Sequence, residues 1–98
     1  MNTTLELSEI IHDKAQNQFQ MHIGKFMAVV DYKMKGGKMY LTHSEVPYHL
    51  RNQGYGQILL EKTFAYIEKN HIEAVAVCTY IRRVKRQSEK WNQLIGEL

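Results

Sequence analysis

Apolar and polar residues alternate through the first half of the chain with the two-residue period of a β-strand. Residues 19–23, 25–33 and 38–46 each follow this alternation, which is typical of strands with one buried face. Gly24 and Gly36-Gly37 separate the three segments, and glycine tolerates the positive φ that tight hairpin turns need. We therefore expect an antiparallel meander of three strands, preceded by a short apolar segment at residues 10–12. Within the third strand, the alternation assigns one face to Met39, Leu41, His43 and Glu45.

The pattern changes after Pro47. Proline cannot donate a hydrogen bond to a sheet ladder, so we expect the third strand to end or bulge there. From residue 57 to residue 70 the apolar residues follow helical spacing instead. The core stripe of this predicted helix consists of Leu60, Phe64 and Ile67.

The remaining segments complete an α/β arrangement. The small apolar run at residues 74–78 predicts a strand buried on both faces and parallel to the strand that ends at Val46. A basic helix at about residues 81–86 follows, and then a weaker segment that carries Trp91. We expect one α/β domain over residues 1–98 with a mixed sheet, in which an antiparallel meander is followed by strand–turn–helix–strand–helix.

Composition and charge narrow the function classes only slightly. The chain has 98 residues, 44% hydrophobic and 23% charged, which is the profile of a single ordinary globular domain. A net charge of +3 suits a polyanionic small ligand or weak attraction to nucleic acid. The single cysteine, Cys78, excludes an internal disulfide and a cysteine-based zinc site. The histidines outside the third strand have no metal-ligand spacing, so no metal is expected; they are His12, His22, His49 and His71.

No apolar run approaches the roughly 20 residues that span a bilayer, and Met1–Thr4 has no signal-peptide pattern. We therefore expect a cytoplasmic protein without a membrane partner.

The junction at residues 46–57 carries the strongest sign of a ligand. The predicted strand leads into a loop with Gly54 and Gly56, and this loop opens directly into the predicted helix. Free N–H groups at a helix start form an anion site, and glycine lets the backbone approach phosphate oxygens closely. Arg51 adds a guanidinium that matches phosphate geometry. No Gly-Lys-Ser/Thr follows, which excludes a Walker loop, and the antiparallel meander makes a poor Rossmann match.

This turn resembles the signature of a known enzyme family. Arg51-x-x-Gly54-x-Gly56 is similar to the Arg/Gln-x-x-Gly-x-Gly/Ala signature of the GNAT superfamily of acetyl-CoA-dependent N-acetyltransferases. The segments His43–Pro47 and Cys78–Tyr80 resemble the His-Thr-Glu-Val-Pro and Cys-Ser/Pro-Tyr/Phe motifs of a minimal subgroup of about 100 residues. The resemblance covers roughly residues 19–91. The sequence departs from the pattern at Ser44 and at Asn52-Gln53, where threonine and a basic residue are common.

The resemblance implies a GNAT-type fold and acetyl-CoA or CoA as cosubstrate. It implies that the strands ending at Val46 and at Cys78 splay apart and admit the pantetheine arm, which the backbone near Val46 would bind like an added strand. The resemblance identifies no amine acceptor. Because the chain is short, the acceptor could be an exposed amine of a macromolecule, and the protein could be a monomer or a weak dimer. The residues implied for cofactor binding are Val46, Arg51, Asn52, Gln53, Gly54, Tyr55, Gly56 and Gln57.

Four residues are candidates for chemistry, each with a plainer alternative. Glu45 is a candidate base for the amine, or a solvated carboxylate at a strand end. His43 is a proton relay, or a structural partner of Glu45. Cys78 is an acetyl-carrying nucleophile, or a small buried apolar residue. By the resemblance, Tyr80 is the acid that protonates the leaving thiolate.

The basic run at residues 82–86 has three interpretations. Arg82, Arg83, Lys85 and Arg86 form a solvated helix face, a contact for the 3′-phosphate of CoA, or a nucleic-acid surface. Two alternatives to an acetyltransferase therefore remain at this stage. One is a non-catalytic module that binds CoA or senses acetyl-CoA, and the less favoured one is a small nucleic-acid-binding domain.

Overall fold

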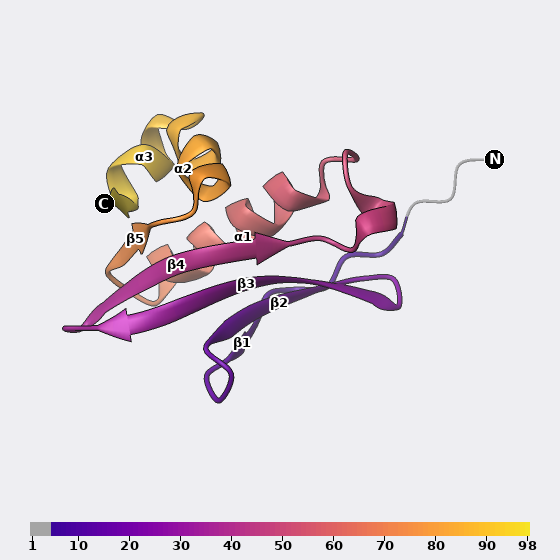
Figure 1. Ribbon diagram of the computed structural model, residues 1–98, viewed down its shortest axis with the longest axis horizontal. Coiled ribbons are helices and arrows are strands. Elements are labelled where there is room, and N and C mark those ends of the chain that lie inside the picture. The colour runs from indigo at the N-terminus through magenta and orange to yellow at the C-terminus, as the bar shows by residue number, and fades with distance from the viewer. Residues whose placement is uncertain (1–4) are drawn as a thin grey trace.

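The first half of the chain folds as a meander of antiparallel strands. In the computed structural model, which describes residues 5–98, these strands are β1 (Ile11–Asp13), β2 (Gln18–Ile23), β3 (Phe26–Lys35) and β4 (Lys38–Glu45). The predicted three-strand meander is confirmed, and the short apolar segment before it supplies the edge strand β1 (Figure 1). The prediction for Met1–Thr4 lies outside the described residues.

The second half adds parallel strands and helices. A single 3-10 turn (Tyr48–Leu50) leads to α1 (Tyr55–Lys69), which is followed by β5 (Ala74–Ala76), α2 (Thr79–Arg86), α3 (Glu89–Leu94) and β6 (Gly96–Glu97). β5 pairs in parallel with β4, and β6 pairs in parallel with β5. Over residues 5–98 the sheet has six strands in the order β1-β2-β3-β4-β5-β6. The predicted α/β class and mixed sheet are confirmed. The strand β6 was not predicted, because two residues are too few to show a periodic pattern.

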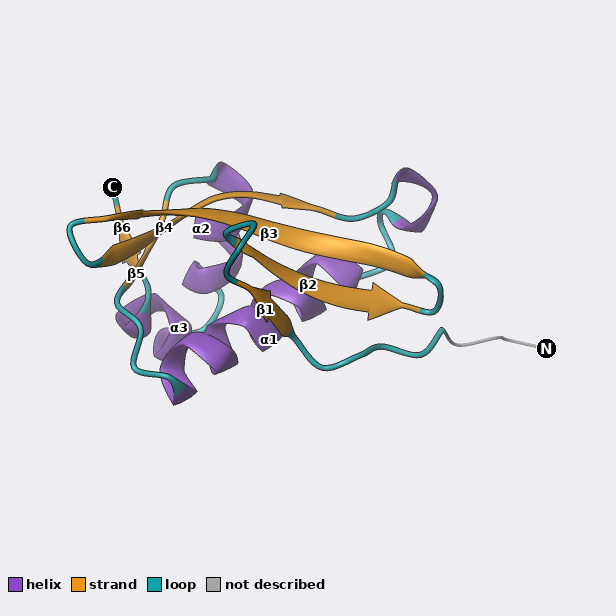
Figure 2. Cartoon of the chain, turned by 90° about the horizontal axis from the view of Figure 1, so that it is seen from below, coloured by secondary structure: helices purple, strands orange, loops and turns teal. Residues whose placement is uncertain are grey.

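The helices gather on one face of the sheet. Figure 1 shows α1 behind the strands, and Figure 2 shows α1 and α3 below the sheet, with α2 beginning at the level of β4 and running toward them. The side chains of β2 and β3 that point toward α1 are buried, and the predicted α1 stripe is fully buried against them. The opposite face of β2, β3 and β4 has no helix over it among residues 5–98 (Figure 2). The largest fully buried side chains are Phe19, Phe64, Met21, Ile23, Leu41, Leu59, Leu60, Ile67, Ile81 and Ile95.

A β-bulge interrupts the pairing of β3 with β4. Tyr32 lies opposite Leu41, but the preceding residue, Asp31, lies opposite His43. Thr42 is therefore an extra residue on β4, and its hydroxyl donates to the Asp31 carbonyl oxygen at 3.3 Å. An extra residue shifts the two-residue period by one position.

The bulge corrects the predicted face of the strand end. Met39 and Leu41 point into the core, as predicted. His43 and Glu45, which the alternation assigned to the same face, lie beyond the bulge on the face without helices. The prediction was wrong because the sequence pattern contains no sign of the extra residue at Thr42. As a consequence, both polar groups are exposed to solvent rather than buried under α1.

The apolar run at residues 74–78 forms a shorter strand than predicted. β5 ends at Ala76, and only Ala74 and Ala76 are buried, so the expectation of burial on both faces is wrong. The chain then turns, and Cys78 becomes the N-cap of α2, which begins at Thr79 rather than at Ile81. Tyr80 is therefore a residue of the first helical turn. No helix within residues 5–98 has the length and apolar character needed to cross a membrane.

Candidate functional site

β4 and β5 separate beyond Leu41. The last hydrogen bonds between the two segments run from the amides of Val77 and Cys78 to the Leu41 carbonyl oxygen, at 3.0 and 3.3 Å. β4 continues to Glu45, whereas the segment that follows β5 turns away into α2 (Figure 1). The backbone of β4 after Leu41 therefore has a free edge on this side, although its other edge pairs with β3.

A cleft of about 480 Å³ lies at this separation, next to the start of α1. Its walls come from the end of β4, the loop before α1, and the start of α2. The lining residues are His43, Ser44, Glu45, Val46, Leu50, Arg51, Asn52, Gly54, Gly56, Cys78 and Tyr80. The structure thus brings together all four residues that were singled out for chemistry and most of those implied for cofactor binding. Leu50 was missed, although a single leucine in a polar loop is a sign of burial, and it is 6% exposed.

Three residues expected in the cofactor site do not line the cleft. The Gln53 side chain donates to the His49 carbonyl oxygen at 3.4 Å, and the Gln57 side chain donates to Glu61 at 3.0 Å. Tyr55 packs against the hydrophobic core. Any contact that these residues make with a phosphate would therefore come from their backbone amides.

The start of α1 is an uncapped helix terminus. Gly54 precedes the helix with φ +88°, and the first helical hydrogen bond is accepted by its carbonyl oxygen from the Ile58 amide at 3.2 Å. No side chain caps the terminus, and the first turn contains no acidic residue. Asn52 also has a positive φ, +64°. The amides of residues 55–57 therefore form the positive end of a 15-residue helix beside the cleft.

Arg51 is held in place by its own loop. Its Nε donates to the Val46 carbonyl oxygen at 3.2 Å, and its guanidinium lies 5.4 Å from the centre of the Tyr48 ring. The terminal nitrogens of the guanidinium extend beyond this contact and are suited to an anion. The Val46 carbonyl keeps a second lone pair for a ligand.

His43 and Glu45 form a loose pair at the rim of the cleft. The His43 Nε2 lies 3.7 Å from the Glu45 Oε1, which is longer than a hydrogen bond, and both side chains are more than half exposed. This geometry leaves the carboxylate accessible to an incoming group and its water. It differs from the fixed hydrogen bond that a purely structural histidine would make.

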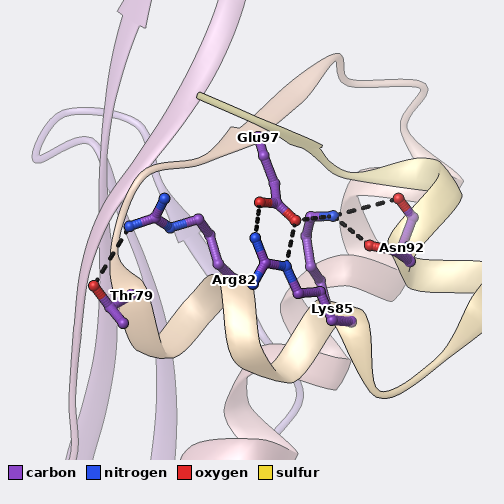
Figure 3. A network of polar contacts seen from close by, with 6 residues as sticks. Thr79, Arg82, Lys85, Asn92 and Glu97 are labelled. Atoms are coloured by element: carbon purple, nitrogen blue, oxygen red, sulfur yellow. Dashed lines mark hydrogen bonds and ion pairs between the residues drawn. The ribbon is translucent and has the colours of Figure 1, made fainter.

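Two residues of the basic run anchor the end of the chain (Figure 3). Lys85 is 2% exposed, and its Nζ lies 2.8 Å from Glu97 Oε2 and 2.6 Å from the side-chain oxygen of Asn92. Arg86 makes two hydrogen bonds to the same carboxylate. These hydrogen bonds from Arg86 and Lys85 lower the pKa of Glu97 to about 2. The interpretation of the run as a solvated face is therefore wrong for Lys85, and half of the run joins α2 to β6.

The other half remains on the surface. Arg82 contacts the Thr79 hydroxyl at 3.5 Å, and Arg83 has no carboxylate partner among residues 5–98. Within the described residues, no group of three or more His, Cys, Asp or Glu side chains is arranged to hold a metal ion.

A second hollow, of about 530 Å³, lies between α1 and α3. Lys90 and Glu68, which both line this hollow, form a salt bridge of 3.2 Å across it. None of the residues singled out for chemistry lines this hollow, and it is open to solvent. The cleft beside α1 is therefore the candidate site.

Comparison with known proteins agrees with the fold. A family model described as GCN5-related N-acetyl-transferase matches residues 18–94. The chain belongs to this family, and the resemblance read from its motifs is confirmed. Membership supports acyl-CoA-dependent acetyl transfer in general terms. No curated protein matches the sequence significantly.

Proposed function

We propose that the chain binds acetyl-CoA in the cleft beside α1 and transfers the acetyl group to an amine. The observation that carries this proposal is the free edge of β4 after Leu41, which runs directly toward the uncapped start of α1. A free strand edge suits the amide-rich pantetheine arm, and an uncapped helix terminus suits a pyrophosphate. The two features lie side by side in one cleft.

In the proposed complex, the pantetheine arm lies along residues 42–46 of β4 and bonds to the backbone near Val46. The pyrophosphate is held by the amides of residues 52–57 and by the guanidinium of Arg51. This arrangement places the thioester between the end of β4 and the start of α2, where Glu45, Cys78 and Tyr80 line the cleft.

The proposed reaction is attack of the amine nitrogen on the thioester carbonyl carbon. A C–N bond forms as the C–S bond breaks, and the electron pair of that bond leaves with the sulfur of CoA. Glu45 takes the proton lost by the amine, directly or through water, and His43 can pass it to solvent. Tyr80 donates its proton to the departing thiolate. A route in which Cys78 first accepts the acetyl group remains a second hypothesis, tested by intact mass after exposure to acetyl-CoA with Cys78→Ala as control.

The acceptor that we propose is an exposed amine of a macromolecule. Glu45 lies on the face of the sheet that no helix covers among residues 5–98. An open face admits a bulky acceptor, whereas it offers little enclosure to a small free amine. We propose that the chain acts in the cytoplasm, as a monomer or weak dimer.

Gly54 provides the sharpest test of cofactor binding. A Cβ at Gly54 would meet no atom within 4 Å, but the φ of +88° is strained for alanine, so Gly54→Ala should distort the start of α1. We expect acetyl-CoA affinity to fall roughly 10-fold, which corresponds to about 1.4 kcal/mol. Gly37→Ala is the matched control, because Gly37 has φ +79° with equally open surroundings in the hairpin between β3 and β4.

Each variant is titrated with acetyl-CoA, and the binding is monitored by the chemical shifts of the backbone amides in NMR spectra. In the wild type, shifts should centre on Val46 and on residues 52–57. Equal affinity in the two glycine variants, or shifts centred on another surface, would refute the site. Steady release of CoA that requires an added amine supports an enzyme, and tight binding without turnover supports a non-catalytic module. Salt-dependent RNA or DNA binding without any acetyl-CoA binding would support the nucleic-acid alternative.

A further inference from the structure

The two glycines of the turn serve different physical purposes. Gly54 has a positive φ and open space around it, so its backbone conformation explains the glycine. Gly56 lies inside α1 and is not among the residues with positive φ. A helical position gives no conformational reason for glycine, which is less favourable there than alanine. Besides the close approach of a phosphate, which the turn is proposed to allow, the reason for Gly56 is sought in the side chains beside it.

Tyr80 fills the space next to Gly56. A Cβ built on Gly56 would lie 2.9 Å from the Tyr80 hydroxyl oxygen, 3.3 Å from Cε2 and 3.4 Å from Cζ. The first distance is shorter than real Cβ contacts, so any side chain at position 56 must displace the phenol ring. Gly56 and Tyr80 both line the cleft. The ring of Tyr80, which is 37% exposed, thus lies against the first turn of α1 in the space that the missing side chain leaves.

We propose that Gly56 is a positioning residue that holds the Tyr80 hydroxyl in the cleft. This inference rests on the proposed function, in which Tyr80 donates a proton to the departing thiolate. Alanine at position 56 keeps the backbone N–H that a phosphate would use, but its methyl group pushes the phenol away. Gly56 therefore acts on the chemistry at the thioester through Tyr80, in addition to the part that its backbone takes in the proposed phosphate turn.

The test compares Gly56→Ala, Tyr80→Phe and the double variant in acetyl transfer to an amine acceptor such as a lysine-containing peptide. Gly56→Ala should lower kcat roughly 10-fold, because ordinary contact begins near 3.4 Å and the hydroxyl must move by about 0.5 Å away from its place in the cleft. Because the methyl group also lies at the proposed phosphate turn, kcat is compared at saturating acetyl-CoA, and any loss of cofactor affinity is measured separately as Kd. Tyr80→Phe should lower kcat at least as much, and the double variant should be no slower than Tyr80→Phe alone.

A second readout follows the ring itself in the free protein. With 3-fluorotyrosine incorporated, the fluorine resonance that disappears in Tyr80→Phe identifies Tyr80. Gly56→Ala should shift this resonance, whereas Gly37→Ala should leave both the resonance and kcat unchanged. An unshifted resonance, or additive losses of kcat in the double variant, would overturn the inference.

Failure of the proposed function has a different signature. If the wild type bound acetyl-CoA but no amine acceptor were acetylated, transfer would be refuted and the catalytic part of this inference with it. The fluorine resonance would still decide whether Gly56 positions Tyr80. If acetyl-CoA did not bind at all, the cleft assignment itself would fail.

Discussion

At the scale of single residues, His12 links three elements far from the cleft. Its Nε2 lies 2.7 Å from the Tyr32 hydroxyl, its Nδ1 lies 3.2 Å from the Tyr66 hydroxyl, and its ring stacks on Phe19 at 4.4 Å. A neutral imidazole donates one hydrogen bond and accepts another, which matches two hydroxyl partners. Burial, with a smaller contribution from Lys14, lowers the pKa of His12 below 6.5. The edge strand β1 is thus joined to β3 and α1 by a histidine that is held neutral.

This arrangement predicts a pH dependence of stability. The pKa of His12 is lower in the folded state than in the unfolded state, so the unfolded chain binds more protons as the pH falls. The stability contributed by neutral His12 is fully present above about pH 6.5 and is lost as the pH falls through the folded-state pKa. Thermal unfolding between pH 8 and pH 5 should show this loss. His12→Gln should flatten it, and an equally steep acid loss in that variant would contradict the assignment.

The residues of the cleft were more accessible to sequence reasoning than His12. Arg51, Gly54 and Gly56 lie close together in sequence, so their spacing and the family resemblance together predict an anion site. The partners of His12 are Tyr32 and Tyr66, which lie 20 and 54 positions away. No local pattern reveals such contacts, because only the packing of the sheet on α1 brings them together.

At the scale of elements, β6 and Glu97 hold α2 in place. The Glu97 carboxylate pairs with the buried Lys85 and with Arg86, and α2 carries Cys78 and Tyr80 at its other end. Sequence reasoning missed β6 because two residues have no period. It missed the bulge at Thr42 because one extra residue leaves the local pattern unchanged while reversing the face of everything after it.

Removal of the Glu97 charge should destabilise the fold. Glu97→Gln leaves the Lys85 ammonium buried without its anion, and an unpaired buried charge is costly. We expect the unfolding midpoint at pH 7 to fall by several degrees. Because the folded pKa of Glu97 is about 2 and its usual value is 4.5, the contribution is fully present above about pH 4.5 and is lost between that pH and pH 2. The difference between wild type and variant should therefore shrink at pH 3.

Glu73→Gln is the matched control for this prediction. Glu73 pairs with Lys38 at 3.9 Å, and both side chains are about half exposed or more. Exposed pairs of this kind contribute about 0–1 kcal/mol, so the control should unfold nearly as the wild type does. Equal destabilisation by the two substitutions would show that the Glu97 network has no special role.

At the scale of the whole molecule, the core and the cleft share one helix. α1 buries Phe64 and its neighbours against the sheet, and the first turn of the same helix lines the cleft. Sequence reasoning reached this level of the fold well, because the helix stripe and the parallel strand have strong patterns. The separation of β4 from β5 was predicted only from the family resemblance. It depends on the length of β5 and on the turn at Cys78, which have no local sequence pattern.

This coupling predicts that ligand binding compensates for damage to the core. Phe64 is fully buried, so Phe64→Ala should cost about 3–5 kcal/mol, a large share of the roughly 5–15 kcal/mol that stabilises a domain. Acetyl-CoA at about 100 times its Kd should restore about 2.7 kcal/mol if it binds only the folded state. The expected shift in unfolding free energy is the same for the wild type and for Phe64→Ala.

Denaturant unfolding with and without acetyl-CoA measures both shifts. Adding Gly54→Ala to Phe64→Ala should remove about half of the restoration and leave about 1.4 kcal/mol, because a roughly 10-fold loss of affinity brings the ligand to about 10 times its Kd. A wild-type shift that disappears in Phe64→Ala alone would mean that the core substitution also destroys the cleft. Equal shifts in both backgrounds, reduced only when Gly54→Ala is added, would mean that the cleft forms whenever the domain is folded and that its affinity depends on the turn rather than on the core.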